Sequence, residues 1–256
     1  MKATELFDIE GKNAIVTGGG RGLCRAMAEA LHEAGARVLI IGRDEDTLAC
    51  AAQEMGAEGA PVLYEAGDLG ELDGIEALYK RAAAKLGEPD ILVNGAGIQH
   101  RAPAEDFPLS EWQKIINVNL SAVFALSQLA GRSMLARGRG KIINIASMTS
   151  FFGSERVPAY AASKGGVAQL TKALSNEWAG RGVCVNAIAP GYMETVLTKD
   201  IKTTNPRYYE EITNRIPAHR WGRPDDLKGI TLFLASAASD YVSGAVIPVD
   251  GGFLGK

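Results

Sequence analysis

Tyr160 and Lys164 are a pair of side chains whose types and spacing could carry out acid–base chemistry. They are four residues apart, so on a helix they share one face. A phenol has a pKa of about 10 and exchanges protons poorly at neutral pH, but a neighbouring ammonium lowers that pKa. Such a pair could trade a proton with an alcohol or a carbonyl. Taken alone it indicates little, because a surface lysine beside a half-buried tyrosine occurs on many helices.

A glycine-rich turn near the N-terminus predicts a site for a dinucleotide. It follows the apolar run 14–17 and precedes a helical pattern. Glycines let the backbone approach a pyrophosphate, and a helix N-terminus supplies N–H groups and a positive dipole. An ordinary strand-to-helix turn would look similar, but its position in the first strand–helix unit favours phosphate binding. The residues expected to bind the cofactor here are Gly18, Gly20, Arg21, Gly22 and Leu23.

The end of the second apolar run bears on which dinucleotide binds. Folds that prefer NAD usually carry an acidic residue there for the ribose hydroxyls. In this chain the position is Gly42, and Arg43 follows it. Arg43 and Arg21 could together bind a 2′-phosphate. We therefore expect NADP(H), with NAD(H) possible if Arg43 only faces solvent.

Two further strand ends supply candidate cofactor contacts. Asp68 and Leu69 follow the third strand, where the carboxylate could meet the adenine edge, although Asp68 could equally cap a helix. Small residues end the fourth strand and would let a cofactor lie against the strand tips at the switch in strand order. The residues expected to contribute there are Asn94, Ala96 and Gly97.

Short apolar runs alternate with helical patterns along the chain and would position these residues. Runs without polar alternation indicate strands that are covered on both faces. This order predicts an α/β fold, a doubly wound parallel sheet with helices on both faces, in one domain spanning 1–256. The runs are 14–16, 38–41, 91–93, 142–145, 183–185 and 245–247, and the helical patterns are 25–33, 46–55, 75–85, 110–135, 158–179 and 226–235.

Composition argues against several classes of function. The net charge is −3, so there is no general electrostatic case for binding nucleic acid or an anionic membrane. No apolar stretch is long enough to span a bilayer, and no signal peptide is evident. Three scattered cysteines suit a reducing cytoplasm, and three distant histidines form no metal motif. We expect a cytoplasmic protein that acts on a small molecule and holds no metal.

In their order along the chain, these motifs resemble the short-chain dehydrogenase/reductase family. Each motif is weak alone, but the ordered set is specific and covers essentially the whole chain. The resemblance implies a Rossmann-type fold and an NAD(P)-dependent oxidoreductase, assembled as a homotetramer. The matching motifs are Thr17-Gly18-x-x-x-Gly22, Asn94-x-Ala96-Gly97, Asn119, Ser147, Tyr160-x-x-x-Lys164 and Pro190-Gly191.

The resemblance also implies a role for each site residue. Tyr160 would be the general acid in ketone reduction and the base in alcohol oxidation, while Ser147 would hydrogen-bond the substrate oxygen. Lys164 would lower the pKa of Tyr160 and bind the nicotinamide ribose, and Asn119 would anchor a water that relays protons to solvent. The residues expected near the nicotinamide carboxamide are Pro190, Gly191 and Thr195.

Two positions depart from the family pattern. Cys24 replaces the third glycine of the phosphate loop, and Gly95 stands where the usual motif reads Asn-Asn-Ala-Gly. The family glycine lets the helix pack on the strand. Cysteine is small enough to be tolerated there, and we expect it to be packed and inert. The departures concern cofactor affinity rather than the reaction.

Segments in the second half of the chain resemble the sugar-acid branch of the family. That branch includes 2-keto-3-deoxygluconate and gluconate dehydrogenases, which interconvert a secondary alcohol and a ketone; the former are usually described with NAD. A sugar acid carries a carboxylate, so its pocket should offer a cation and hydroxyl partners. The matching segments are 141–148, 156–158, 176–179, 186–192 and 215–222. The substrate candidates are Gln99, Arg101, Ser147, Arg156, Tyr160 and Tyr192, with Arg220 and Trp221 as packing residues or contacts.

Residues 192–222 include a polar stretch with few structural signals and are expected to form a mobile substrate lid. Two other functions stay open. One is an NADPH-dependent ketoreductase for another carbonyl, such as a 3-oxoacyl-carrier-protein thioester. The other is a non-enzymatic dinucleotide sensor, which the presence of all four catalytic types disfavours.

Overall fold

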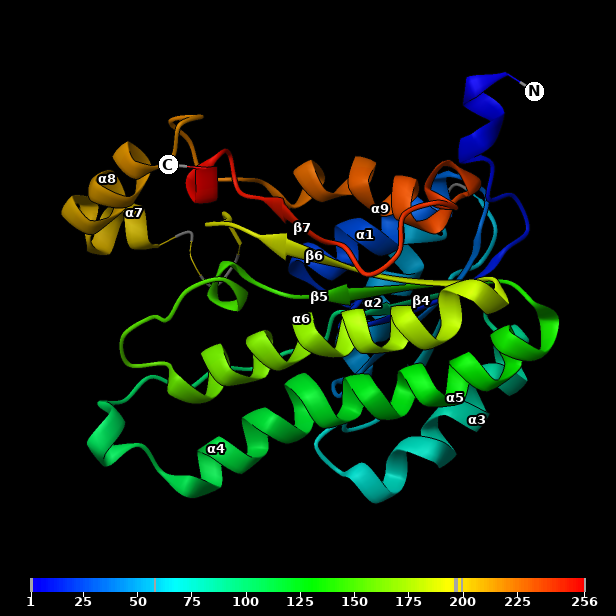
Figure 1. Ribbon diagram of the computed structural model, residues 1–256, viewed down its shortest axis with the longest axis horizontal. Coiled ribbons are helices and arrows are strands. Elements are labelled where there is room, and N and C mark those ends of the chain that lie inside the picture. Colours follow the sequence, from blue (N-terminus) through cyan, green and yellow to red (C-terminus); the bar gives the residue numbers. More distant parts are fainter. Residues whose placement is uncertain (1, 58, 196–197, 199, 256) are drawn as a thin grey trace.

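Seven strands make up one parallel sheet in the computed structural model of the chain, which describes residues 2–57, 59–195, 198 and 200–255 (Figure 1). The strands are β1 (Asn13–Thr17), β2 (Arg37–Gly42), β3 (Leu63–Ala66), β4 (Ile91–Asn94), β5 (Gly140–Ile145), β6 (Val183–Pro190) and β7 (Val246–Val249). Their order is β3-β2-β1-β4-β5-β6-β7. The direction of winding therefore reverses between β1 and β4, and ligands of such sheets bind at the carboxyl ends beside that switch.

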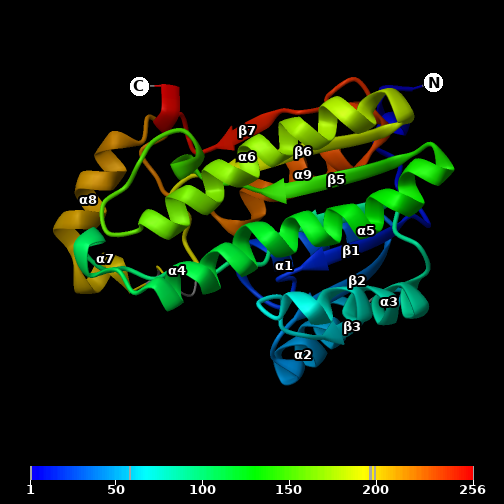
Figure 2. The same cartoon turned by 60° about the horizontal axis from the view of Figure 1, so that its bottom comes forward.

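Helices cover both faces of the sheet (Figure 2). One face packs against α1 (Gly22–Glu33), α2 (Glu45–Met55) and α9 (Lys228–Ala235). The other packs against α3 (Ile75–Leu86), α5 (Ala122–Arg137) and α6 (Pro158–Trp178). The predicted α/β, doubly wound architecture is confirmed.

Successive residues of a strand enter opposite core layers. In β1, Ala14 and Val16 pack with Met27 of α1, whereas Ile15 packs with Leu126 of α5. All of these side chains are fully or almost fully buried. Burial on both faces explains why the strands read as continuous apolar runs.

A third strand was expected before Asp68, but the predicted apolar runs do not include β3. Its sequence is Leu-Tyr-Glu-Ala, which breaks an apolar run with a carboxylate. Glu65 is nonetheless buried, because Arg81 and Lys85 of α3 bind its two oxygens at 2.6 Å and 2.7 Å. A buried charge that is paired in this way is tolerated in a strand.

The predicted helix 110–135 is interrupted. It consists of α4 (Leu109–Ile116), a π-helical turn (Asn117–Ser121) and α5. A π turn inserts an extra residue and changes the direction in which the following side chains point. An apolar pattern summed over the whole segment does not reveal one extra residue, so sequence analysis missed it.

Two helices stand in the predicted lid. They are α7 (Ile201–Thr204) and α8 (Pro206–Arg215), and they lie beyond the carboxyl ends of the strands (Figure 1). Asn205 caps α8 by accepting a hydrogen bond from the Tyr208 N–H at 3.2 Å. Positions 196, 197 and 199 of the lid lie outside the described residues. The weak structural signals before Tyr208 in the sequence did not indicate α7 or the start of α8.

Within the described ranges, no helix combines the length and the apolarity needed to cross a membrane.

Candidate active site

Tyr160, Lys164 and Ser147 come together where α6 begins beside the end of β5. Lys164 is 4% exposed, and its Nζ donates a hydrogen bond of 2.5 Å to the carbonyl of Ile145, the last residue of β5. The Ser150 hydroxyl donates to the Lys164 carbonyl at 2.7 Å, which fastens the turn that follows Ser147 to α6. These bonds fix the serine turn and the helix relative to each other.

The pKa values of the tyrosine and the lysine are both set first by burial. Burial lowers the pKa of Lys164 to about 8. It raises the pKa of Tyr160, and hydrogen bonding with the Ser147 side chain opposes that rise. The Lys164 Nζ lies 5.8 Å from the centre of the Tyr160 ring. In this geometry the hydrogen bond with Ser147 is what lowers the pKa of the Tyr160 phenol. That Lys164 also lowers this pKa stays a prediction.

Asn119 sits in the π-helical turn and joins two parts of the site. Its side chain accepts from the Ile98 N–H and donates to the Ile98 carbonyl, both at 2.9 Å. It also donates to the Ser163 hydroxyl at 3.2 Å, and Ser163 donates to the Tyr160 carbonyl at 2.8 Å. Both the oxygen and the nitrogen of the Asn119 side-chain amide already form hydrogen bonds. A water anchored by Asn119 would therefore have to bind the backbone of this residue.

Gly97, Asn119 and Lys164 meet at one point from three separate elements. A Cβ atom on Gly97 would lie 3.5 Å from Oδ1 of Asn119 and 3.8 Å from Nζ of Lys164. The strand-end motif, the π-helical turn and the α6 motif are therefore neighbours in space, as their predicted roles require.

The glycine-rich turn has the geometry of a phosphate cradle. Gly18 has φ of +75°, and a Cβ atom there would lie 3.1 Å from the backbone of Ala96. Gly22 has φ of +62° and opens onto free space at the start of α1. A side chain is thus disfavoured at Gly18, while the N–H groups that begin α1 stay accessible to an anion. These residues fit the phosphates of a dinucleotide.

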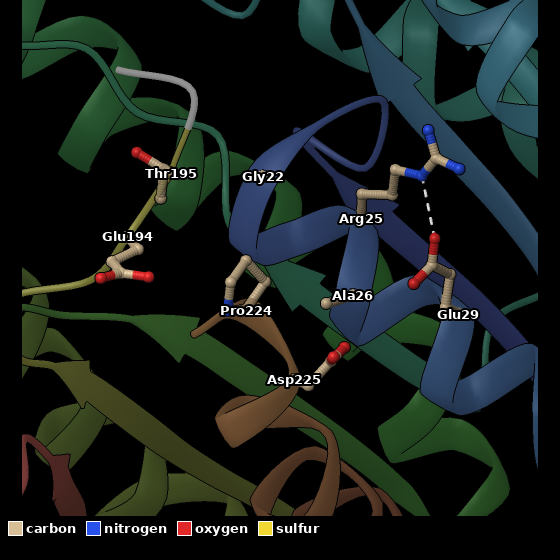
Figure 3. A pocket seen from close by; sticks show the side chains of 8 residues that line it. All are labelled: Gly22, Arg25, Ala26, Glu29, Glu194, Thr195, Pro224 and Asp225. Carbon is tan, nitrogen blue, oxygen red and sulfur yellow. Dashed lines mark hydrogen bonds and ion pairs between the residues drawn. The ribbon is translucent and has the colours of Figure 1, made fainter. Parts of the chain in front are cut away.

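A cavity of about 410 Å³ lies beside the start of α1 and brings two predicted cofactor residues together (Figure 3). Gly22 borders it from the glycine-rich turn, and Thr195 borders it from the segment after β6. The Thr195 N–H donates to the Thr198 hydroxyl at 2.8 Å. The lining residues are Gly22, Arg25, Ala26, Glu29, Glu194, Thr195, Pro224 and Asp225.

Arg21 and Arg43 both border the turn between β2 and α2. Arg43 is exposed directly after β2, and Arg21 is exposed in the glycine-rich turn. Asp44 caps the start of α2 by accepting hydrogen bonds from Thr47, and these bonds lower the pKa of the Asp44 carboxyl. The positive charge of Arg21 lowers that pKa further. Arg21 is thus close to this turn, as binding of a 2′-phosphate by both guanidiniums requires.

Three predicted cofactor residues have interior or local roles. Asp68 accepts a hydrogen bond from the Gly70 N–H at 2.8 Å, and Leu69 is buried in the core. Asn94 is also buried, and its amide nitrogen donates to Ser127 at 3.0 Å and to Asn144 at 2.9 Å. These bonds from the amide nitrogen tie β4 to β5 and α5, while the buried amide oxygen has no hydrogen-bond partner in the described part of the chain. No local pattern in the sequence indicated the partners of Asn94, which come from distant segments.

The substrate candidates lie on loops around the carboxyl end of the sheet. The Ala102 N–H donates to the Arg156 carbonyl at 3.0 Å, which joins the loop of Gln99 and Arg101 to the loop before α6. The backbone of Arg156 has a φ of +65°, in the left-handed region. Residues other than glycine adopt this conformation at a cost in free energy. The charge of Arg101 acts on the pKa of Tyr192, so these two candidates are close.

Aromatic contacts surround Tyr192. Its ring lies 5.4 Å from Trp221 and 5.5 Å from Phe253. Trp221 is buried and donates to the Thr213 hydroxyl at 3.1 Å, while Arg220 forms an ion pair with Asp226 at 2.7 Å. Trp221 thus packs in the core of this region, whereas Arg220 is held in an exposed ion pair. Phe253 was missed because the C-terminal segment carries no motif that would place it here.

Comparisons with known proteins agree on one family. A sequence profile described as short chain dehydrogenase matches residues 12–206. A 2-dehydro-3-deoxy-D-gluconate 5-dehydrogenase of Bacillus subtilis is 50% identical over 256 residues, covering 98% of each chain. A gluconate 5-dehydrogenase of Gluconobacter oxydans is 37% identical, again covering 98% of each. The crystal structure of a gluconate 5-dehydrogenase from Burkholderia cenocepacia in complex with NADP and tartrate has a TM-score of 0.94, 40% identity and full coverage of both chains.

Proposed function

The chain belongs to the short-chain dehydrogenase family, and on that premise we propose that it transfers a hydride between a nicotinamide cofactor and a sugar acid. The reacting group is a secondary alcohol or its ketone, on a substrate of the 2-keto-3-deoxygluconate or gluconate type. The observation that carries the proposal is the meeting of Tyr160, Lys164 and Asn119 beside Gly97. Relatives named for such substrates, similar over nearly the whole chain, support the choice.

The side chains supply proton transfer and orientation. A bound nicotinamide would accept the hydride from the alcohol carbon, or return it to the ketone. Ser147 would donate a hydrogen bond to the substrate oxygen and hold it beside Tyr160. In oxidation Tyr160 takes the hydroxyl proton, which then leaves to solvent; in reduction Tyr160 gives the proton to the ketone oxygen. Oriented hydroxyls stabilise the charge that develops on that oxygen.

NADP(H) is the favoured cofactor in this proposal, and NAD(H) is the second choice. The positions of Arg21 and Arg43 at the β2–α2 turn support NADP(H), because a 2′-phosphate needs cations there. A relative of known structure was crystallised with NADP. Residues 192–222 would close over the substrate as a lid within the single domain 1–256.

We also propose a homotetramer that works in the cytoplasm. Apolar side chains are exposed on α4 and α5, where Leu109 is 83% and Phe124 is 45% exposed. Contact with another subunit would remove this apolar surface from water, which favours association. Light scattering after size exclusion tests the proposal; a monomer at micromolar concentration would contradict it.

The direct test of function is the absorbance of the reduced nicotinamide with purified enzyme. Gluconate and 2-keto-3-deoxygluconate are offered with each oxidised cofactor, and 5-ketogluconate with each reduced one. We expect turnover of at least one sugar acid, and a higher kcat/KM with NADP(H). Acetoacetyl thioesters serve as the competing substrate class. Turnover of the thioesters without turnover of any sugar acid would overturn the proposal in favour of a ketoreductase.

A further inference from the structure

Arg215 is the last residue of α8, and its guanidinium lies near the substrate candidate Tyr192. Its guanidinium lies over the ring of Phe253, 4.7 Å from the ring centre. The same ring contacts Tyr192 edge-on at 5.5 Å. Stacking of this kind holds a guanidinium in place and leaves its N–H groups free to bind an anion.

Arg215 differs from its neighbours in its partners. Arg207 on the same helix pairs with Glu211 at 2.9 Å, and Arg220, in the segment after α8, pairs with Asp226 at 2.7 Å. Arg215 and Arg101 form no ion pair with any carboxylate in the described part of the chain. Two guanidiniums from distant segments are therefore available to an added anion.

Both cations act on one phenol. Burial and Tyr208 raise the pKa of Tyr192, and the charges of Arg215 and Arg101 oppose that rise. Arg215 belongs to α8, whereas Arg101 belongs to the loop after β4. The ring of Phe253, which contacts both Arg215 and Tyr192, places the Arg215 guanidinium beside Tyr192.

This place adjoins the catalytic serine. Met148 follows Ser147 in sequence and is buried in one cluster with Trp221 and Phe253, against which Tyr192 packs. Tyr192 in turn follows the Pro190-Gly191 motif at the end of β6. Arg215 therefore lies near the turn that carries Ser147, on the side formed by α8 and the C-terminal segment.

We propose that Arg215 is a specificity-determining residue that binds the carboxylate of the substrate, with Arg101 as the second cation. The inference rests on the proposed function and adds a residue to it. A guanidinium and a carboxylate form two parallel hydrogen bonds, so the contact selects acids over neutral sugars and fixes which carbon reaches Tyr160. The ring of Phe253 sets the direction of the guanidinium.

Arg215→Gln tests the inference, with Arg207→Gln on the same helix as the matched control. Each variant is assayed with the sugar acid that the wild type turns over and with sorbitol or fructose, which lack the carboxylate. A charged hydrogen bond contributes about 1.5–3 kcal/mol, so Arg215→Gln should lower kcat/KM for the acid about 10- to 100-fold, mainly through KM. The neutral substrates and the Arg207→Gln variant should change less than about 2-fold, within the scatter of surface substitutions.

Two further measurements separate binding from folding. NADPH binding, followed by fluorescence, should be unchanged in Arg215→Gln, and competitive inhibition by tartrate should weaken. Arg215→Lys keeps the charge and should recover part of the activity toward the acid; if Arg215→Gln does not fold, this variant carries the comparison. Equal losses for acid and neutral substrates, or no loss, would overturn the role of Arg215 alone. A wild type inactive toward every sugar acid would overturn the proposed function as well.

Discussion

The Sγ atom of Cys24 fills the space that a side chain at position 95 would need. A Cβ atom on Gly95 would lie 2.2 Å from that sulfur, and the thiol donates a hydrogen bond of 3.3 Å to the Gly95 carbonyl. Burial raises the pKa of Cys24 to about 11, so the thiol is neutral and packed, as expected. The two departures from the family pattern are thus one coupled feature between α1 and the end of β4.

Gly95→Ala should destabilise the protein, because the added methyl group overlaps the sulfur. Overpacking of this kind costs about 1–3 kcal/mol. Cys24→Ala removes the sulfur, so adding Gly95→Ala to Cys24→Ala should cost less than adding it to the wild type. Denaturant unfolding of all four proteins gives the coupling. Gly229→Ala is the control, since a Cβ atom there meets no atom within 4 Å; additive losses in the cycle would rule out the coupling.

Tyr160→Phe should abolish most turnover while the cofactor still binds. General acid–base catalysis contributes roughly 10²–10⁴-fold, so kcat should fall by about that factor. Steady-state rates and NADPH fluorescence titration measure the two effects separately. The matched control is Tyr241→Phe, at a fully exposed tyrosine. Near-normal turnover of Tyr160→Phe would remove the phenol from the mechanism.

Arg43→Ala should weaken NADPH binding far more than NADH binding. Loss of a charged hydrogen bond to phosphate costs about 1.5–3 kcal/mol, which corresponds to a rise in the Kd for NADPH of roughly 10- to 100-fold. Titration with both cofactors measures the ratio. Arg37→Ala, at the opposite end of β2, is the control. Equal losses for the two cofactors would contradict binding of a 2′-phosphate by Arg43.

The stability of the cofactor-free protein should depend on Lys164 at alkaline pH. Burial lowers the pKa of this lysine to about 8 from its ordinary value of 10.5. Between these two pKa values the folded state binds fewer protons than the unfolded state. The free energy of unfolding therefore rises with pH in this range, and it falls again as the pH is lowered toward 8. Lys164→Met should therefore show a smaller gain between pH 8 and pH 10 than the wild type, by about 2 kcal/mol.

Denaturant unfolding at the two pH values measures this difference. Lys80→Met serves as the control, because it removes an exposed lysine that pairs with Glu76. Its pH dependence should match that of the wild type. An identical gain in Lys164→Met would show that the buried ammonium does not titrate in this range.

Asn119→Ala should lower both stability and kcat. The substitution removes three hydrogen bonds and leaves the half-buried backbone groups of Ile98 without their partner. The expected loss is about 1–3 kcal/mol, because a polar group that loses its partner away from water costs more than an average hydrogen bond contributes. Asn117→Ala, in the same π-helical turn, loses bonds to Gln113 and Gly70 and should cost less. Equal stability of the two variants would contradict the clamp between Asn119 and Ile98.

The sequence by itself determined the fold class and the family. Apolar runs and helical periods are local patterns, and alternation of the two already implies a parallel sheet covered on both faces. The spacing of Tyr160 and Lys164 is also local, because a single helix turn sets it. The order of the motifs then sufficed for the family.

Only the tertiary structure decided which distant side chains meet. The inward direction of the Asn94 amide, the contact of Cys24 with position 95 and the placement of Arg215 on Phe253 each join segments far apart in the chain. The π-helical turn at Asn119 is local, yet one added residue hardly alters an apolar pattern. Strand order brings such segments to one edge of the sheet, and packing then fixes the direction of each side chain. A linear pattern of residue types shows neither the order of the strands in the sheet nor the direction of each packed side chain.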